Sequence, residues 1–144
     1  MPRTRILFVC TGNSCRSQLA EAWARHLLGD AVEAHSAGLK MMELDPHGVA
    51  VMDEVGIDIS DHRCKLVEEF QGQPFDVVVT VCGHAEMECP DFPGAQRLYC
   101  GFGNPARLAA GLEDPERIRG VYRRTRDRIR EFVASLPQEM SGTA

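Results

Sequence analysis

The sequence predicts an α/β fold in which a four-stranded parallel sheet is flanked by helices on both faces, a Rossmann-like three-layer arrangement. Short apolar segments alternate with segments of helical periodicity, which is typical of βαβ units. The apolar segment at 5–10 is continuous, as expected for a strand buried on both faces. No repeat or linker interrupts the chain, so we expect one domain over 1–137 and a flexible tail over 138–144.

Four segments have the composition of strands. R-I-L-F-V-C comes first, and F-D-V-V-V-T-V-C is the richest in β-branched residues. V-E-A-H-S-A-G ends in a turn signal, and R-L-Y-C is the weakest of the four. We therefore expect strands over 5–10, 32–38, 75–82 and 97–100.

Helical patterns fill the intervals after these strands. Apolar residues recur at helical spacing over 19–27, and this helix is expected to stop near Gly29. A second helix has Asp45 as its N-cap, and a short third one is capped by Asn104. The last helix starts at D-P-E-R-I, and its apolar face consists of Ile118, Val121, Tyr122, Ile129, Phe132, Val133 and Leu136.

Composition restricts the classes of partner. The net charge of −5 argues against broad electrostatic binding to nucleic acid or anionic lipid. The cations are almost all arginines, with Lys40 and Lys65 the lysines, which favours local recognition of an oxyanion. No segment approaches the roughly 18 consecutive apolar residues of a membrane span, and the first apolar run is too short for a signal peptide. We expect a cytoplasmic monomer that binds neither nucleic acid nor membranes.

Six cysteines occur, at positions 10, 15, 64, 82, 89 and 100. Because the chain has no signal peptide and enough residues for a core, we expect reduced thiols and at most transient disulfides. The spacings of Cys10 from Cys15 and of Cys82 from Cys89 are too wide for the usual zinc ligand pairs. We therefore expect no bound metal or other cofactor.

The stretch V-C-T-G-N-S-C-R-S, residues 9–17, joins the first strand to the first helix. Ligands of open α/β sheets bind beyond the carboxyl ends of the strands, where these backbone N–H groups and the helix dipole suit an anion of phosphate size. Gly12 permits a positive φ, and Asn13 tolerates one. Arg16 offers a planar fork to two oxyanion oxygens.

Cys10 stands at the head of this loop. The N-terminus of a helix favours the thiolate form, and Ser17 adds a hydroxyl donor. From the residues alone, Cys10 is a nucleophile, half of a redox pair, or a buried cysteine at a strand end. The combination of C-x5-R with glycine, asparagine and serine favours an anion site over a structural cysteine.

V-C-T-G-N-S-C-R-S-Q-L-A-E resembles the signature of the low-molecular-weight protein tyrosine phosphatase superfamily and, more narrowly, of its thioredoxin-coupled arsenate reductases. The likeness continues through H-S-A-G, G-I-D-I-S-D-H, V-V-V-T-V-C, C-P and G-F-x-x-P-A, at 35–38, 56–62, 77–82, 89–90 and 101–106. It implies a low-molecular-weight phosphatase-like fold, Cys10 as the nucleophile and Ser17 as the group that tunes its thiolate. The implied oxyanion cradle consists of Thr11, Gly12, Asn13, Ser14, Cys15 and Arg16.

The same resemblance implies reduction of arsenate to arsenite, with phosphate or sulfate as substrate analogues. Cys82 attacks the arsenylated Cys10 and forms a Cys10–Cys82 disulfide, and Cys89 converts it to Cys82–Cys89 by thiol exchange. Thioredoxin then supplies the electrons, with a glutaredoxin system as the alternative donor. The loop after Cys82 must rearrange, and Gly83 is its expected hinge. The resemblance gives no role to Cys64 or Cys100.

Asn104 departs from the family pattern, because the related enzymes carry an aspartate there that acts as a general acid. An asparagine caps a helix and donates a hydrogen bond, but it transfers no proton. Either Asn104 positions the oxyanion while water or substrate supplies the proton, or another acid such as Asp114 reaches the site. Asp114 is the expected N-cap of the last helix, and phosphomonoester hydrolysis is expected to be weak.

Lys65 is a second departure. Some of these reductases hold a potassium ion with residues that match Asn13, Glu21, Ser36 and an acidic residue at position 65. A lysine there repels a cation, so we expect a Lys65–Glu21 pair in place of the ion, unless Lys65 is simply exposed.

Two other functions stay open. A low-molecular-weight phosphatase acting on phosphotyrosine or small phosphomonoesters uses the same loop, although Asn104 disfavours it. The aspartate-proline-tyrosine segment of such phosphatases is also absent at 101–106. A non-catalytic oxyanion-binding or arsenite-binding protein belongs to another class and predicts stoichiometric capture without turnover.

Overall fold

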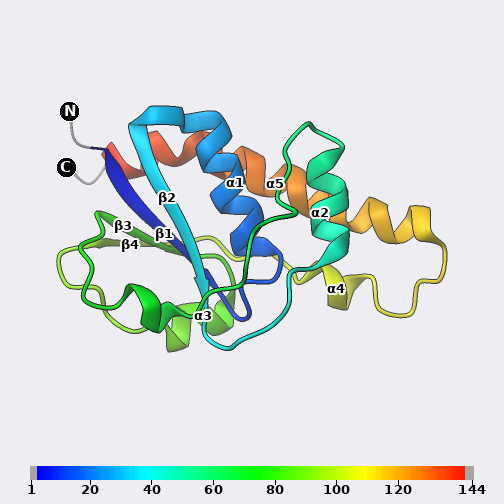
Figure 1. Ribbon diagram of the computed structural model, residues 1–144, viewed down its shortest axis with the longest axis horizontal. Helices are drawn as coiled ribbons and strands as arrows, with labels where there is room; N and C mark the ends of the chain where they lie inside the picture. The colour runs from blue at the N-terminus through cyan, green and yellow to red at the C-terminus, as the bar shows by residue number, and fades with distance from the viewer. Residues whose placement is uncertain (1–2, 142–144) are drawn as a thin grey trace.

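Four parallel strands form one sheet in this structure, a computed structural model that describes residues 3–141. The strands are β1 (Thr4–Cys10), β2 (Val32–Gly38), β3 (Val77–Thr80) and β4 (Gln96–Tyr99), in the order β2-β1-β3-β4 (Figure 1). Residues 6–9 of β1 pair with both neighbouring strands and are fully buried. The continuous apolar run therefore forms a central strand, and the predicted parallel sheet is confirmed.

The strand β3 is shorter than the strand predicted over 75–82. Val81 N donates to Val9 O at 2.9 Å, so the chain still runs beside β1 for one more residue. The next residue, Cys82, is the N-cap of the short helix α3 (Gly83–Glu88). The strand ends early because the chain turns here into a helix, which leaves Cys82 at the carboxyl edge of the sheet.

Helical segments cover both faces of the sheet, as predicted. The helices α1 (Arg16–Leu28) and α5 (Pro115–Ser141) pack together, and α2 (Pro46–Asp53) lies against α5 (Figure 1). Adjacent residues of a strand point to opposite faces. In β2, Ser36 Oγ donates to Glu21 of α1, whereas the His35 ring contacts Phe70 in the short helix η2 (Val67–Phe70). The fold is thus a three-layer arrangement.

The helix boundaries follow the predicted signals. Asp45 Oδ1 accepts a backbone N–H at 2.9 Å at the start of α2. Asn104 Oδ1 accepts one at 3.0 Å at the start of α4 (Pro105–Leu108). The helix α1 ends before Gly29, which has a φ of 52° and begins the 3₁₀ turn η1 (Gly29–Ala31). The two predicted N-caps and the predicted stop at Gly29 are confirmed.

The helix α5 continues past Pro137 to Ser141, which corrects the predicted tail for residues 138–141. A proline removes one helical N–H, but two contacts hold the helix beyond it. Gln96 Nε2 donates to Glu139 O at 3.3 Å, and Met140 packs against the core. The rest of the predicted tail, 142–144, lies outside the described residues.

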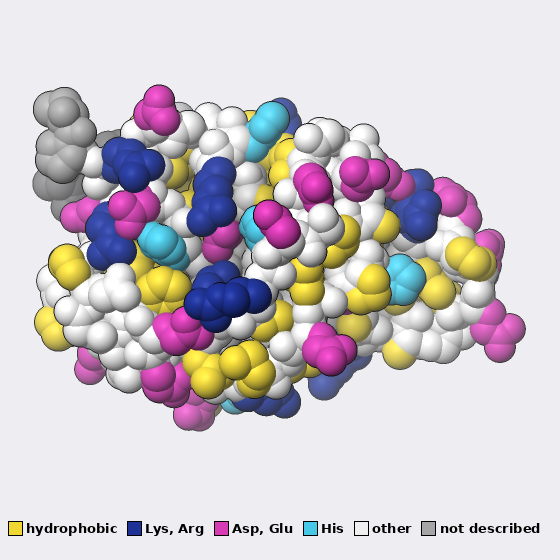
Figure 2. Space-filling view, in the orientation of Figure 1, with side chains coloured by type: hydrophobic (Ala, Val, Ile, Leu, Met, Phe, Trp, Pro, Cys, Tyr) yellow, Lys and Arg dark blue, Asp and Glu magenta, His cyan; other side chains and the backbone are white. Residues whose placement is uncertain are grey.

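Basic and acidic side chains are interspersed on the face shown in Figure 2, without an extended region of one charge. Even α5, which has 27 residues, is rich in charged side chains. Within residues 3–141, no helix combines the length and the hydrophobicity needed to cross a membrane.

We predict that Leu136→Ala lowers the free energy of unfolding by about 2–5 kcal/mol, because the Leu136 side chain is fully buried and its loss leaves a cavity. Arg124→Ala, at an exposed position of the same helix, is the matched control and changes it by no more than about 0.5 kcal/mol. Urea denaturation followed by circular dichroism measures both. Equal stabilities of the two variants would contradict the packing of the end of α5.

Candidate active site

The loop between β1 and α1 is held by hydrogen bonds from neighbouring segments. Thr11 O accepts the N–H groups of residues 39 and 40 at 2.8 and 3.0 Å, and Ser14 O accepts Asp45 N at 3.0 Å. A Cβ on Gly38 would come within 2.6 Å of backbone atoms of the loop. Because backbone atoms cannot move aside, a glycine at the end of β2 is required for this close approach.

Asn13 is the buried centre of the loop, and its φ of 54° is the one positive φ of a non-glycine residue within 3–141. Its Oδ1 accepts Lys65 N at 2.9 Å and Gln18 Nε2 at 3.0 Å. Its Nδ2 donates to Ser17 Oγ at 2.8 Å, and its backbone oxygen accepts Cys64 Sγ at 3.2 Å. Because these partners fix the amide orientation, Nδ2 can only point at the serine hydroxyl.

Cys10 is the last residue of β1 and is buried, with its Sγ 2.9 Å from Ser17 Oγ. The serine oxygen already accepts a hydrogen bond from Asn13, so its own hydrogen is free to be donated to the sulfur. A donated hydrogen bond stabilises a thiolate, as does the nearby N-terminus of α1. Both donors therefore lie where they could stabilise a negative charge on the Cys10 sulfur.

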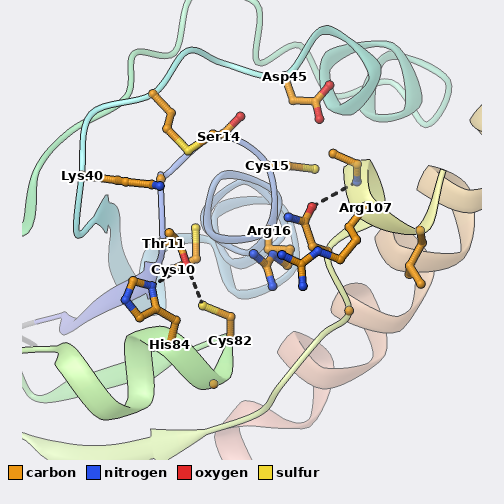
Figure 3. A pocket seen from close by; sticks show the side chains of 17 residues that line it. Cys10, Thr11, Ser14, Cys15, Arg16, Lys40, Asp45, Cys82, His84 and Arg107 are labelled. Atoms are coloured by element: carbon orange, nitrogen blue, oxygen red, sulfur yellow. Dashed lines mark hydrogen bonds between the residues drawn. The ribbon is translucent and has the colours of Figure 1, made fainter. Parts of the chain in front are cut away.

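A cleft of about 660 Å³ opens in front of Cys10 and is lined by the loop, the chain after β2, and the starts of α3 and α4 (Figure 3). Arg16, Lys40 and Arg107 supply positive charge to it, and Asp45 is the one carboxylate among its lining residues. Three cations around one cleft suit a small oxyanion that carries more than one negative charge.

Cys15 lies within the loop but has a different environment from Cys10. It is buried, and desolvation together with the Asp45 carboxylate raises the pKa of its thiol far above the usual range. Asp45 itself is held as an acceptor by Tyr122, whose hydroxyl lies 2.6 Å from Asp45 Oδ2. Cys15 therefore stays a neutral thiol, which agrees with a role in the loop backbone.

Cys82 lines the same cleft as Cys10 (Figure 3). Its sulfur accepts Ala85 N at 3.4 Å, as the N-cap of α3, and lies 3.4 Å from Thr11 Oγ1. The strands β1 and β3 are neighbours, so the residues at their carboxyl ends meet at one edge of the sheet. The two predicted reactive cysteines are therefore brought together.

Cys89 is not among the residues that line the cleft. It follows α3, its thiol is bonded to Pro90 O at 3.4 Å, and burial raises the pKa of that thiol. The six residues of α3 separate it from Cys82, which corresponds to roughly 10 Å along a helix. Cysteines whose Cα atoms are more than about 7 Å apart form no disulfide without backbone movement.

Asn104 lines the cleft, whereas Asp114 does not. Asn104 Oδ1 caps α4, so the amide N–H₂ of Asn104 is the group available to an oxyanion. Asp114 Oδ1 accepts Glu116 N at 3.0 Å, as the predicted N-cap of α5. Arg16 Nη1 donates to Phe102 O at 2.9 Å, which ties the guanidinium to the segment before α4.

Lys65 Nζ lies 3.7 Å from Glu21 Oε1, which is the pairing expected from the sequence. The Glu21 carboxylate is buried and also accepts Ser36 Oγ at 2.7 Å and pairs with Arg25 at 3.1 Å. Desolvation lowers the pKa of Lys65, and the neighbouring Glu21 carboxylate opposes that shift. Two cations, Lys65 and Arg25, thus pair with the buried Glu21 carboxylate.

Several side chains of the cleft belong to no motif recognised in the sequence, and Asp45, His84 and Arg107 are among the polar ones whose position was not anticipated. Asp45 is recognisable only as a helix cap, and Arg107 lies within a four-residue helix of ordinary composition. His84 follows Cys82 by two residues, and its Nδ1 lies 3.2 Å from Thr11 Oγ1. The strand-end position of Cys82 is the signal that places His84 near the loop.

Comparisons with known sequences give a consistent result. The profile of the family described as low molecular weight phosphotyrosine protein phosphatase matches residues 5–143. A protein of Halalkalibacterium halodurans named arsenate reductase is 42% identical over 139 residues, 96% of this chain and 98% of that protein. Its namesake in Bacillus subtilis is 43% identical over 133 residues, 89% of this chain and 94% of that protein.

Solved structures share the fold. An arsenate reductase in the phosphate binding state has a TM-score of 0.75 at 32% identity, over 95% of this chain and 98% of that one. A thioredoxin-dependent arsenate reductase of Corynebacterium glutamicum has a TM-score of 0.68 at 28% identity, over 96% of this chain and 64% of that one. The likeness in sequence and in fold therefore extends over nearly the whole chain.

We predict that Ser17→Ala slows alkylation of Cys10 by iodoacetamide at pH 7 by roughly tenfold, because a hydrogen bond to a charged group contributes about 1.5–3 kcal/mol. Ser14→Ala is the control, since Ser14 Oγ donates to Glu43 O and not to the sulfur. Mass spectrometry of the Cys10 peptide gives both rates. Equal rates in the two variants would mean that Ser17 does not stabilise the thiolate.

Proposed function

The chain belongs to the low-molecular-weight phosphotyrosine protein phosphatase family, and from this premise we propose that it is an arsenate reductase. The observation that carries the proposal is the presence of two thiols, Cys10 and Cys82, in one cleft suited to an oxyanion. Relatives named arsenate reductase at 42% and 43% identity support the substrate. Phosphoester hydrolysis requires only one thiol, whereas reduction requires a second.

In the first step, arsenate binds to the backbone N–H groups of residues 11–16 and to the Arg16 guanidinium. The Cys10 thiolate attacks arsenic, a sulfur–arsenic bond forms, and an arsenate hydroxyl leaves as water after taking up one proton from solvent. Ser17 holds the nucleophile as a thiolate until the attack. Phosphate and sulfate have the same tetrahedral shape and charge, so they are expected to compete for the cradle.

In the second step, the Cys82 thiolate attacks the Cys10 sulfur. The sulfur–sulfur bond forms as the sulfur–arsenic bond breaks, and its electron pair stays on arsenic, which becomes arsenite. Arsenic is reduced by two electrons, and the two thiols are oxidised to a Cys10–Cys82 disulfide. The shared cleft and the hydrogen bond from Ala85 N to Cys82 support Cys82 as the attacking thiol.

In the third step, the Cys89 thiolate attacks Cys82 and regenerates the Cys10 thiolate. This attack requires α3 to unwind, because the helix separates the two cysteines in the structure. The segment starts at Gly83, the hinge expected from the sequence. A thioredoxin then reduces the Cys82–Cys89 disulfide, which returns the enzyme to its starting state. The thioredoxin-dependent arsenate reductase among the similar structures supports this donor.

Phosphomonoester hydrolysis is the second candidate activity, because the family description and the thiol at the oxyanion loop both favour it. Departure of an alkoxide or phenoxide requires a proton donor. The cleft offers Asn104 where the resemblance expects an acid, and its one carboxylate, Asp45, is engaged as a helix cap and by Tyr122. Departure of water from arsenate depends less on a proton donor, so the cleft is better suited to arsenate reduction than to phosphomonoester hydrolysis.

We predict that turnover of arsenate with NADPH, thioredoxin reductase and thioredoxin falls to background in Cys10→Ser, Cys82→Ser and Cys89→Ser. Cys100→Ser is the control and keeps its turnover, because Cys100 takes no part in the proposed disulfide relay and does not line the cleft. In a single turnover, Cys89→Ser is expected to release one equivalent of arsenite and to accumulate the Cys10–Cys82 disulfide, identified by peptide mass spectrometry.

Continued turnover without Cys89 would contradict the relay. Stoichiometric arsenite binding without any turnover of the unmodified chain would instead indicate a non-catalytic protein. The same assay with glutathione, glutaredoxin and glutathione reductase decides between the two electron donors.

We predict that Asn104→Asp raises the hydrolysis of an aryl phosphate by about 10²-fold, the lower end of what a general acid contributes. Asn104→Ser is the matched control, because serine also caps a helix but does not act as the acid. Release of the coloured phenol measures both. Unchanged hydrolysis in Asn104→Asp would exclude an acid role at this position.

A further inference from the structure

A short chain of polar atoms connects His84 to Cys82. Thr11 Oγ1 lies 3.2 Å from His84 Nδ1 and 3.4 Å from Cys82 Sγ, so one hydroxyl contacts both side chains (Figure 3). Cys82 is 5% exposed, whereas His84 reaches solvent. The thiol therefore has little contact with water, and the histidine has ample contact.

The hydroxyl between them is able to transmit a proton. It has one hydrogen to donate and lone pairs to accept, so Thr11 accepts the hydrogen of the Cys82 thiol while it donates its own to the unprotonated Nδ1. Cys82 Sγ also accepts Ala85 N, which stabilises the sulfur once it is a thiolate. Every partner needed for removal of the proton is in hydrogen-bond contact.

We propose that His84 receives, through Thr11, the proton that Cys82 loses before it attacks Cys10. The proposal rests on the proposed arsenate reduction. One proton leaves Cys82 Sγ for Thr11 Oγ1 as the Thr11 hydrogen passes to His84 Nδ1, which leaves a thiolate, an unchanged hydroxyl and an imidazolium. The imidazolium keeps this proton, which stabilises the thiolate through Thr11, and releases it to solvent only after Cys82 has attacked Cys10; no electrons are transferred in the proton step.

A base is needed here because the thiolate, and not the thiol, is the nucleophile in disulfide formation. Imidazole is the side chain whose ordinary titration range lies near neutral pH, so it is suited to this transfer. His84 touches neither the arsenic nor a sulfur and is therefore a positioning residue that acts through Thr11.

Other titratable and charged groups line the same cleft as His84 or lie on α3, and they affect any pH dependence. They come from the loop, the chain after β2, α3 and α4, and comprise Cys10, Cys15, Arg16, Lys40, Asp45, Cys82 and Arg107, with Glu86 on α3 itself. All of them are identical in a wild-type protein and a His84 variant. A difference between the two pH profiles therefore reports His84.

The test measures alkylation of Cys82 in the reduced full chain, without arsenate, at intervals from pH 5.5 to 9.5. Iodoacetamide is the probe, and mass spectrometry follows the Cys82 and Cys10 peptides separately. His84→Asn keeps an acceptor for Thr11 but takes up no proton. Thr11→Val removes the hydroxyl at nearly constant volume. His26→Asn, at an exposed histidine outside the cleft lining, is the matched control.

We expect Cys82 alkylation at pH 7 to be about tenfold slower in His84→Asn and in Thr11→Val than in wild type and His26→Asn. The four rates converge at pH 9.5, where the thiolate forms without a base. Equal rates of wild type and His84→Asn at pH 7 would overturn the proposal. A loss of the same size at pH 7 and at pH 9.5 would also overturn it, since it would mark a structural effect.

The outcome is independent of whether arsenate is the substrate, because no arsenate is present. If the chain failed to release arsenite in the thioredoxin assay, the proposed function would fail while the alkylation profiles kept their meaning. If arsenite release succeeded and the alkylation rates were equal at pH 7, only the proton transfer to His84 would be wrong, and the proposed function would stand.

Discussion

The orientation of the Asn13 amide is the constraint on which the rest of the site depends. Its oxygen is fixed by two donors, Lys65 N and Gln18 Nε2, and this forces its nitrogen toward Ser17. The serine hydrogen is then free for donation to Cys10. Buried polar atoms are costly unless they are hydrogen-bonded, and these contacts satisfy the amide and the hydroxyl beside Cys10, which is itself 2% exposed.

The sheet topology converts this local arrangement into a two-thiol site. The strand β1 lies at the centre, and β3 pairs directly with it, so their carboxyl ends open at the same edge. Cys10 ends one strand, and Cys82 follows the other. Thr11 lies between them and contacts Cys82, which links the oxyanion loop to α3. Residues more than sixty positions apart therefore share a cleft through strand order alone.

The positions of residues at strand ends explain which site residues were predictable from the sequence. Cys10, Arg16 and Cys82 were identifiable because strand-end positions and the C-x5-R spacing depend on local chain geometry. The order of the strands was not predicted, because the general rule for open α/β sheets places ligands at the carboxyl ends of the strands whatever their order.

The side chains missed from the sequence depend on tertiary contacts. Asp45 and Arg107 face the cleft because of how α2 and α4 pack, and no local pattern encodes that packing. The continuation of α5 past Pro137 has the same origin, since contacts of Glu139 and Met140 outweigh the loss of one helical hydrogen bond.

The helix α3 is formed in the structure, but it is short enough to unfold locally. Six residues are far below the length at which an isolated helix is stable, so tertiary contacts must hold it. Ala85 is fully buried, but Met87 is 83% exposed. Such a segment belongs to the low-stability end of a domain, where local unfolding requires little free energy.

In the proposed relay, the chemistry itself weakens this helix. While Cys82 is a thiolate, its sulfur accepts Ala85 N and caps α3. Once Cys82 enters a disulfide with Cys10, the sulfur loses its charge and becomes a poor acceptor, so the cap is weakened. Burial holds the Cys89 thiol protonated while the helix is formed, and unwinding exposes it to water and to Cys82. Cys89 is thus released for attack only after the Cys10–Cys82 disulfide has formed.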